Sequence, residues 1–422
     1  MRVSSFVLVS LAIGITAGCA HESSPAFLPA SNVVRSAGAQ SSSSSYKVVH
    51  SFNTGADAQF PQARMTVYKG TLYGTATAGG TYNVGAVFTM SANGTERVVH
   101  SFKYSDGSAP VSGVRVMHGE LYGTTALGGA HGQGTVFRMT PSGKLTVLHS
   151  FKAGPDGFEP LGDLTAYNGT IYGTTYFGGG TYGSSCFAGS PPIGPSIRES
   201  GCGTIFKVSA SGQESRVVNF NGPAGPLSNL IPVKGALYGS TYNGPDTFCS
   251  GTVYSLNDSG QVSVVHYFGG SYGCDPDGGY PAGDLVYENG ALYGTTYYGG
   301  NGSCAGALQC GTVFRVTPSG NEAVIYNFKG APDGFWPTAG LTPLHGLLYG
   351  VTQWGGSGYY GICGILFSIT ASGQETILHN FAGGTQDGCS PTGGLVALHG
   401  TLYGTTSGSG LHNTGTVFSF TP

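Results

Sequence analysis

The segment Leu121-Tyr122-Gly123-Thr124-Thr125 decides the fold, because closely similar segments return along the 422-residue chain. The seven copies begin at Leu72, Leu121, Ile171, Leu237, Leu292, Leu348 and Leu402, and successive starts are 49 to 66 residues apart. Self-similarity at such a period is the signature of a repeat architecture, with the extra residues placed in loops. We therefore expect one structural unit for each copy.

Four strand signals make up each unit, and we label them a to d. Strand a follows a proline and a small residue, as in Pro160-Leu161-Gly162-Asp163-Leu164, and strand b is the Leu-Tyr-Gly-Thr-Thr segment. Strand c reads Gly-Thr-Val-Phe, as in 134–137, and strand d reads Val-Val-His-Ser-Phe, as in 98–102. Turn residues such as Asn168-Gly169 separate the strands, which is typical of antiparallel hairpins.

The two ends of the chain are out of phase with the repeat. The segment from Tyr46 to Phe52 reads as a strand d with no a, b or c before it, whereas the chain stops at Pro422 just after a strand c. If the early strand completes the last unit, each strand type occurs seven times and the ring has no exposed sheet edge. We predict an all-β fold, a seven-bladed β-propeller of four-stranded antiparallel blades over residues 46–422, closed by this N-terminal strand.

The repeat of Leu-Tyr-Gly-Thr-Thr, Gly-Gly and Gly-Thr-Val-Phe resembles the GloVer tandem repeat of bacterial choice-of-anchor surface proteins. The resemblance covers residues 46–422 and implies an exported protein whose family shares the repeat but differs in its anchor. It supplies no activity and no catalytic residues. The segment Asn168-Gly169-Thr170-Ile171-Tyr172 is also similar to kelch repeats, whose period is about 50 residues.

Composition narrows the class of protein. The chain has 75 glycines, 25 tyrosines and 22 phenylalanines but only 17 basic and 20 acidic side chains. A helix-rich enzyme carries about a quarter charged residues, so this composition favours short strands and tight turns. A formal net charge of −3 without a long basic run disfavours nucleic acid as a partner.

The N-terminus reads as an export signal. Arg2 precedes a mainly apolar run from Val3 to Ile15, so we predict a signal peptide over residues 1–18. Ala17-Gly18-Cys19 resembles the bacterial lipobox, which predicts a lipid on Cys19 and a flexible, lipid-anchored tether over 19–45. The alternative is an ordinary signal peptide that happens to contain this cysteine. Either reading places the protein in the bacterial cell envelope, at the outer surface or in the periplasm.

The other eight cysteines form an even set in an exported chain, which favours disulfides. Four of them lie just before a strand c, beside the end of strand d in the hairpin. The expected pairs are Cys186 with Cys202, Cys249 with Cys274, Cys304 with Cys310, and Cys363 with Cys389. The alternative, a cysteine metal cluster, lacks paired Cys-x-x-Cys spacing, so we predict no metal there.

In an up-and-down blade the b-to-c and d-to-a loops emerge on one face, and these loops vary most in length. Binding residues are found on loops more often than on the scaffold, so we place the ligand site on this loop-rich face. Its aromatic residues offer stacking surfaces for sugar rings. The predicted ligand-binding residues are Tyr176, Phe177, Tyr297, Tyr298, Phe335, Trp336, Trp354, Tyr359, Tyr360 and Asn229. Packing between blades is the alternative role for several of them.

The third residue after each strand-a proline is expected near the axis. Among these residues Asp163 and Asp284 are weak candidates for an acid and base pair acting on a glycan, and Arg64 for holding an anionic group. The alternative is a set of capping hydrogen bonds around a water-filled tunnel.

Aspartates recur in the d-to-a loops, at Asp57, Asp106, Asp156, Asp277, Asp333 and Asp387, with Asn221 in the remaining unit. A ring of carboxylates could attract calcium, but Asp-Gly is also a preferred turn sequence. We expect turn formation to be their main role and no cofactor.

These features favour a non-catalytic binding module for a polysaccharide or another envelope or extracellular partner. One alternative is a glycan hydrolase or lyase acting at the tunnel mouth, and the other is a structural or adhesive envelope protein. We expect a monomer, with no catalytic residue beyond the weak candidates.

Overall fold

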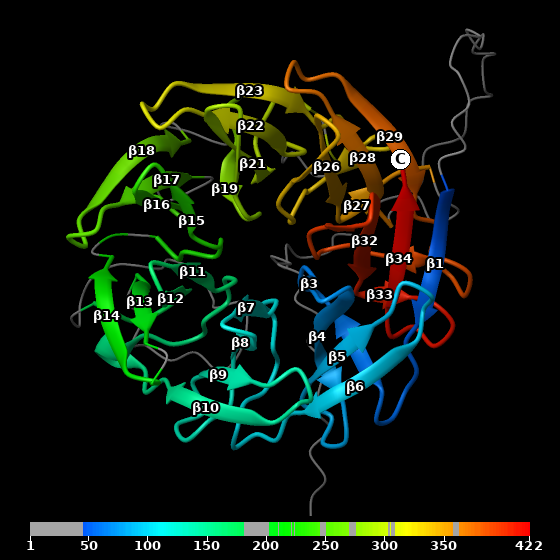
Figure 1. Cartoon of the computed structure of the whole chain (residues 1–422). Helices are drawn as coiled ribbons and strands as arrows, with labels where there is room; N and C mark the ends of the chain where they lie inside the picture. Colours follow the sequence, from blue (N-terminus) through cyan, green and yellow to red (C-terminus); the bar gives the residue numbers. More distant parts are fainter. Residues whose placement is uncertain are drawn as a thin grey trace, which may run out of the picture.

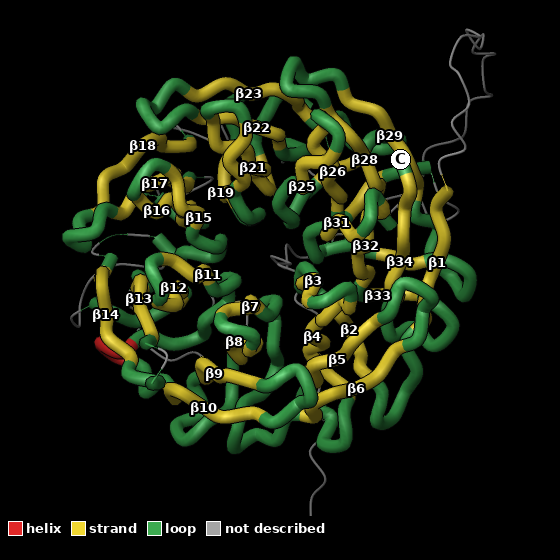
Figure 2. The backbone as a smooth tube through the Cα atoms, viewed as in Figure 1, coloured by secondary structure: helices red, strands yellow, loops and turns green. Residues whose placement is uncertain are grey.

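Seven four-stranded antiparallel blades surround a central axis (Figure 1), which confirms the predicted propeller. The computed structural model describes residues 45–180, 202–209, 211–220, 222, 224–244, 250–269, 276–302, 304, 309–357 and 363–422. Figure 2 shows the strands in concentric layers joined by loops. Within the described residues the one helix is a single 3-10 turn, Gly154–Asp156, and no helix has the length and apolarity needed to cross a membrane.

The two inner layers hold strands a and b. The innermost strands are β3 (Thr66–Tyr68), β7 (Arg115–Met117), β11 (Thr165–Tyr167), β15 (Ile231–Val233), β20 (Val286–Glu288), β25 (Thr342–Leu344) and β31 (Val396–Leu398). The second layer comprises β4 (Thr71–Gly79), β8 (Glu120–Thr125), β12 (Thr170–Thr175), β16 (Ala236–Thr241), β21 (Ala291–Tyr298), β26 (Leu347–Thr352) and β32 (Thr401–Thr406).

The two outer layers hold strands c and d. The third layer comprises β5 (Ala86–Met90), β9 (Thr135–Met139), β13 (Thr204–Val208), β17 (Gly251–Leu256), β22 (Thr312–Val316), β28 (Ile365–Ile369) and β34 (Thr416–Thr421). The rim comprises β6 (Glu96–Ser101), β10 (Leu145–Ser150), β14 (Glu214–Asn219), β18 (Val262–Phe268), β23 (Glu322–Asn327), β29 (Glu375–Asn380) and β1 (Ser45–Ser51).

Strand a begins later than the sequence pattern suggests. In the third blade β11 starts at Thr165, and the predicted segment Pro160–Leu164 lies outside any named strand. In four blades the d-to-a segment instead forms a short separate strand. These strands are β2 (Ala58–Pro61) on β4, β19 (Gly279–Pro281) on β21, β24 (Gly334–Phe335) on β27 (Trp354–Gly355), and β30 (Gly388–Cys389) on β33 (Gly408–Ser409). The d-to-a and b-to-c segments therefore lie together on one face, as predicted.

The N-terminal strand closes the ring. β1 pairs antiparallel with β34, so that Tyr46 lies opposite Phe420 and Val48 opposite Phe418. The blade that contains both ends has the order β1-β34-β32-β31, with the strand from the start of the chain at the rim. The prediction that the ends of the propeller are joined in one blade is confirmed.

The repeated motifs are explained by packing between strands b and c. Gly123 of β8 lies opposite Phe137 of β9, and a Cβ on Gly123 would come within 2.5 Å of the phenylalanine ring. The hydroxyl groups of Thr125 and Thr135 hydrogen-bond each other at 2.8 Å, and equivalent pairs recur in four other blades. Glycine and threonine of strand b thus match phenylalanine and threonine of strand c, which fixes their register.

Candidate functional site

A residue with a left-handed backbone precedes the proline of every d-to-a segment. The φ angles of these residues lie between 50° and 58°. They are Phe60, Ala109, Glu159, Gly225, Tyr280, Trp336 and Ser390. The backbone of the previous blade holds each one, as where Trp336 N–H donates to the Cys310 carbonyl at 2.9 Å. Such conformations persist only where the surroundings enforce them, so these side chains have fixed positions on the loop-rich face.

The residues predicted to lie near the axis come four positions after these left-handed residues in the sequence. Together they form a ring, which we call the axial ring. The Asp163 Oδ1 atom accepts the Gly113 N–H at 2.6 Å, and the Asp284 Oδ1 atom accepts the Asn229 N–H at 2.9 Å. Each carboxylate therefore bridges two neighbouring blades. Within the described residues no hydrogen bond or ion pair engages the Oδ2 atom of either aspartate. These are the capping hydrogen bonds that the sequence analysis gave as the alternative role. One oxygen of each carboxylate still has no donor among the described residues.

Arg64 and Arg115 share this axial region with the two aspartates. The Arg115 Nε–H donates to the Leu164 carbonyl at 3.0 Å, whereas the Arg64 guanidinium makes no hydrogen bond or ion pair within the described part of the chain. Gly394 of the neighbouring blade lies against the arginine, because a Cβ there would be in ordinary contact with Arg64 Cδ at 3.4 Å. Burial and the neighbouring Arg115 lower the pKa of Arg64. The site therefore presents unpaired N–H donors.

Asp284 lies close enough to Asp163, Arg64 and Arg115 for each of their charges to affect its pKa. Burial and the neighbouring Asp163 raise the pKa of Asp284 to about 6, although the Asn229 N–H and both arginines act in the opposite direction. The structure thus brings together Arg64, Asp163 and Asp284. Asn229 joins them, being 6% exposed with an Oδ1 atom that has no hydrogen-bond partner.

The predicted aromatic residues divide into two groups. Tyr176, Phe177, Tyr297 and Tyr298 are at most 5% exposed and pack between blades. Phe335, Trp336 and Trp354 are half-buried, and their rings meet edge to face at 5.2 and 6.4 Å. Tyr359 and Tyr360 lie outside the described residues. Of the predicted and described rings, those of the sixth blade therefore offer surface to a ligand, and the half-buried Tyr280 of the fifth blade lies nearby in the sequence pattern. Tyr82 and Tyr104, in loops of the same face, are 52% and 56% exposed and were not predicted.

Sequence reasoning missed Glu159 and Arg115. Glu159 is 5% exposed, its Oε2 atom has no hydrogen-bond partner, and burial raises its pKa to about 7. The signal was present, because Glu159 is the one carboxylic acid in the ring of residues before the prolines. Arg115 occupies the position where Thr66 and Thr165 hydrogen-bond the next blade, so aligning the repeats would have identified it too.

The loop aspartates form separate turns and no common ring of ligands. Asp57 accepts the Asn53 N–H at 2.7 Å, Asp106 the Lys103 N–H at 2.8 Å, and Asp156 the Lys152 N–H at 2.9 Å. Each of these carboxylates also lies near a histidine of the preceding rim strand, as His149 does to Asp156. Asn221 lies outside the described residues. This geometry supports the turn role.

Two of the predicted disulfides are present as paired, Cys304 with Cys310 and Cys363 with Cys389. Cys202 is also disulfide-bonded, but its predicted partner Cys186 lies outside the described residues, as do Cys249 and Cys274. Cys19, the signal peptide and the tether lie outside them as well. Disulfides of this kind are typical of proteins outside the cytoplasm.

Solved structures that resemble the chain are distant in sequence. A puromycin hydrolase mutant has 12% identity and a TM-score of 0.51, and the alignment covers 82% of this chain but 50% of the hydrolase. BamB from Moraxella catarrhalis has 9% identity and a TM-score of 0.47, over 89% of this chain and 85% of BamB. A protein assigned as a 6-phosphogluconolactonase, from Bacteroides uniformis, has 14% identity and a TM-score of 0.47, over 75% and 83%. At these identities a likeness concerns the fold alone.

A search of curated protein sequences finds no match. A family model matches residues 38–187 and 195–418, which is most of the chain and includes part of every blade. This agrees with the resemblance that the repeated motifs suggested. The chain belongs to the Gloeobacter/Verrucomicrobia repeat family.

Proposed function

We propose that the propeller is an exported, surface-anchored, non-catalytic module that binds a polysaccharide through its loop-rich face. The observation that carries this proposal is the unpaired Arg64 guanidinium beside two carboxylates that each keep a free oxygen. A sugar supplies hydroxyl groups that both donate and accept hydrogen bonds, which suits such a mixed set of donors and acceptors. Arginine pairs well with carboxylates, so acidic sugars are favoured over neutral ones.

The half-buried rings of Tyr280, Trp336 and Trp354 support the same ligand class. Tyr280 and Trp336 are held by the backbone on the chain segments that lead to Asp284 and Gly340 of the axial ring. Rings fixed in this way offer apolar surface next to polar groups, an arrangement that suits a sugar ring. A chain of sugars can therefore contact the axial charges with one residue and the aromatic rings with another.

Binding to acidic and neutral glycans, measured on an array and then by calorimetry, tests the proposal. We expect Arg64→Gln to weaken binding of a uronic-acid polysaccharide about tenfold or more, because a hydrogen-bonded charge pair is lost. Trp336→Ala should weaken binding of acidic and neutral glycans alike, because a stacking surface is removed.

Two matched variants control for general damage. Arg315→Gln changes an exposed arginine of β22, and Tyr267→Ala removes a 53% exposed ring of β18, so neither should change binding. If neither class of glycan binds, or if the Arg64 and Arg315 variants behave alike, the axial site is not a polysaccharide site. The search would then move to protein partners and to an adhesive or structural role in the envelope.

A second candidate function is glycan hydrolysis or elimination at the axis. The observation that favours it is Asp284, whose pKa of about 6 beside Asp163 suits a general acid. Release of shorter sugars from a bound polysaccharide, lost in Asp284→Asn while binding persists, would favour this reaction. Binding without any product over long incubation would exclude it.

We also propose that Cys19 carries the membrane anchor. The support is the Ala17-Gly18-Cys19 sequence and the oxidising surroundings that the disulfides require. Intact-mass measurement of the mature protein tests this, because lipidation predicts an N-terminal cysteine with added acyl mass. A mature chain that begins elsewhere without added mass would contradict it.

A further inference from the structure

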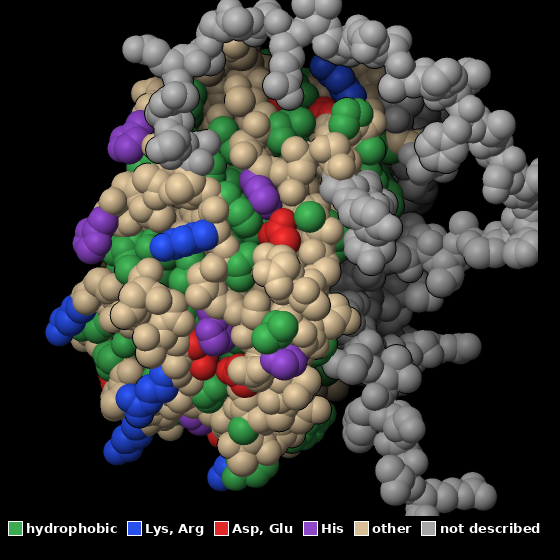
Figure 3. Space-filling view, turned by 90° about the vertical axis from the view of Figure 1, so that its right-hand side faces the viewer, with side chains coloured by type: hydrophobic (Ala, Val, Ile, Leu, Met, Phe, Trp, Pro, Cys, Tyr) green, Lys and Arg blue, Asp and Glu red, His purple; other side chains and the backbone are tan. Residues whose placement is uncertain are grey.

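Three metal-ligating side chains from two blades converge at the seam where the ring closes. They are His50 of β1, Asp57 of the following turn, and Glu96 at the start of β6. One ligand atom from each lies within 4.8 Å of the other two. The three side chains are half-buried at the rim. Figure 3 shows histidines beside acidic side chains on this side of the propeller.

Two side-chain atoms of this cluster lack partners within the described residues, whereas the Asp57 carboxylate accepts the Asn53 and Ala58 N–H groups at 2.7 and 2.8 Å. His50 Nε2 and Glu96 Oε1 are each shielded from solvent and have no hydrogen-bond partner in the described structure. Both unpartnered atoms belong to side chains whose ligand atoms converge in this cluster. A metal ion bound at this position would give both unpartnered atoms a ligand bond.

The same arrangement recurs two blades further on. His149 of β10, Asp156 of the next turn and Glu214 at the start of β14 also place their ligand atoms within 4.8 Å of one another. Here His149 Nε2 hydrogen-bonds both Asp156 carboxylate oxygens, at 3.1 and 3.2 Å, unlike the unpartnered His50 Nε2, and Glu214 Oε1 is buried without a partner in the described structure. Both clusters lie at the rim of the propeller, on side chains that the axial site does not use.

Other blade interfaces do not bring three ligand atoms within 4.8 Å in the described structure. One of them has all three residue types, because His266 Nε2 hydrogen-bonds Asp277 Oδ2 at 3.2 Å and Glu322 begins β23, but the three do not converge as closely. His100 and Asp106 lie 3.6 Å apart, but Leu145 stands at the first position of β10, where β6 and β14 have glutamate. At another interface Asp333 and Glu375 are present, but Tyr326 replaces the histidine and donates to Asp333 at 2.9 Å. The blades pack together at these interfaces although three ligand atoms do not converge there. The interfaces therefore serve as internal controls for the two clusters.

We propose that the His50, Asp57, Glu96 cluster and the His149, Asp156, Glu214 cluster each bind one divalent transition-metal ion of the zinc type. One imidazole and two carboxylates suit zinc better than calcium, which prefers oxygen ligands alone. The two carboxylates of each cluster can supply two negative charges, which one such ion neutralises. Zinc bonds of about 2.0–2.2 Å bring ligand atoms within about 4 Å of one another, so small rotations of these half-buried side chains complete the site. Water would occupy the remaining coordination position.

Zinc binding to the metal-stripped, non-reduced protein tests this proposal by calorimetry and elemental analysis after dialysis. We expect two zinc ions per chain, one in Glu96→Gln or Glu214→Gln, and none in the double variant. The glutamine keeps the size of the side chain and removes the charge. His50→Asn provides a second way to remove the first site. Cobalt in place of zinc should give a visible spectrum without thiolate bands.

Glu375→Gln is the matched control, because it changes a glutamate at the same strand position where no histidine is present. This variant should keep both zinc ions. Circular dichroism and the melting temperature report whether each variant is folded. Wild-type protein that retains less than one zinc ion, or a folded double variant that retains as many as the wild type, would overturn the proposal.

Discussion

At the scale of single residues, a position that must be glycine determines the fold as much as a position that needs a particular side chain. Gly123 is needed because Phe137 occupies the space where its Cβ would be, and the Leu-Tyr-Gly motif recurs since each blade repeats this contact. Arg64, Asp163 and Asp284 could be predicted as a group from their shared place after a proline. Their hydrogen bonds to neighbouring blades could not be predicted. These bonds depend on the twist between blades, which the sequence pattern does not specify.

The glycine argument predicts the effect of a single methyl group. We expect Gly123→Ala to lower the free energy of unfolding by about 1–3 kcal/mol, because the added carbon overlaps the Phe137 ring and forces strands b and c apart. Chemical denaturation measures this change. Gly222→Ala is the control, since nothing lies within 4 Å of a Cβ there. Equal stability of the two variants would contradict the packing account.

Glu159 predicts a pH dependence of stability. Burial raises its pKa to about 7, above the ordinary value of 4.5, so the folded state holds a proton that the unfolded state has lost. The free energy of unfolding therefore falls as the pH rises from about 5 to 8, by about 3 kcal/mol from this group. Glu159→Gln stays neutral and should lose less stability over this range, as measured by denaturation in the presence of a chelator. Parallel pH profiles of the two proteins would contradict this.

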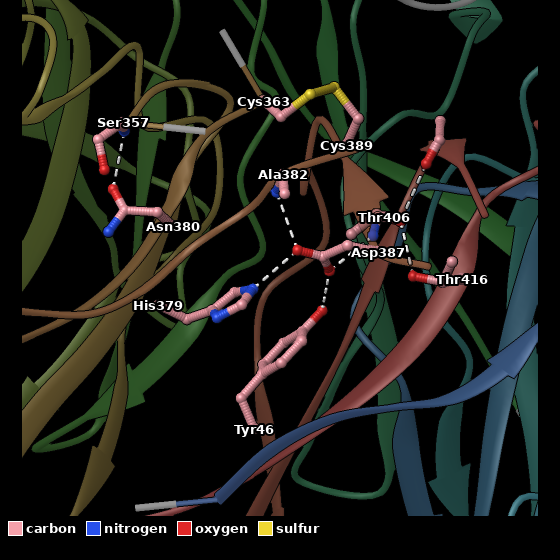
Figure 4. A network of polar contacts seen from close by, with 12 residues as sticks. Tyr46, Ser357, Cys363, His379, Asn380, Ala382, Asp387, Cys389, Thr406 and Thr416 are labelled. Atoms are coloured by element: carbon pink, nitrogen blue, oxygen red, sulfur yellow. Dashed lines mark hydrogen bonds and ion pairs between the residues drawn. A yellow bond between two sulfur atoms is a disulfide. The ribbon is translucent and has the colours of Figure 1, made fainter. Parts of the chain in front are cut away.

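At the scale of elements, the closing strand is fastened by side chains as well as by its backbone. The Tyr46 hydroxyl of β1 donates to Asp387, which also accepts the Ala382 N–H at 2.8 Å and contacts His379 at 2.9 Å (Figure 4). Burial alone would raise the pKa of Asp387, but the hydrogen bonds from His379 and Tyr46 hold it below its ordinary value. The Cys363–Cys389 disulfide lies beside this network.

This network predicts how much the free energy of unfolding falls when a side-chain contact of the closing strand is removed. We expect Tyr46→Phe to lower the free energy of unfolding by about 1.5–3 kcal/mol, because the buried Asp387 carboxylate loses a donor. Tyr267→Phe is the comparison, since that ring is 53% exposed on another rim strand and should leave stability unchanged. Thermal denaturation of the pair measures the difference. If both variants match the wild type, Tyr46 does not fasten the closure.

The strand order of the elements was predictable from the sequence, whereas the start of strand a was not. The pattern after Pro160 suggested a strand, but the residue before that proline has a positive φ and proline has no N–H to donate, so regular pairing begins at Thr165. The place of the aromatic residues in the blades was predictable from the sequence, but which of their rings are exposed was not. Tyr297 is buried whereas Trp354 is half-buried, and only the packing of adjacent blades decides between them.

At the scale of the whole molecule, every site described above is built between blades. The axial charges bridge the second blade to the third and the fourth to the fifth, and the first proposed metal site spans the seam between the last blade and the first. A ring that opened at the seam would separate His50 from Glu96 and free the rim strand of the last blade. The account therefore depends on β1 remaining paired with β34 in solution.

Amide hydrogen exchange, followed by mass spectrometry of peptides from the native protein, tests this pairing most directly. β6 is the reference, because it holds the same rim position in the first blade without joining the two ends of the chain. We predict that the peptide containing residues 45–51 exchanges as slowly as the β6 peptide, since both are paired on a third-layer strand. Complete exchange of residues 45–51 at the earliest time, while β6 stays protected, would show that the ring is not closed by this strand.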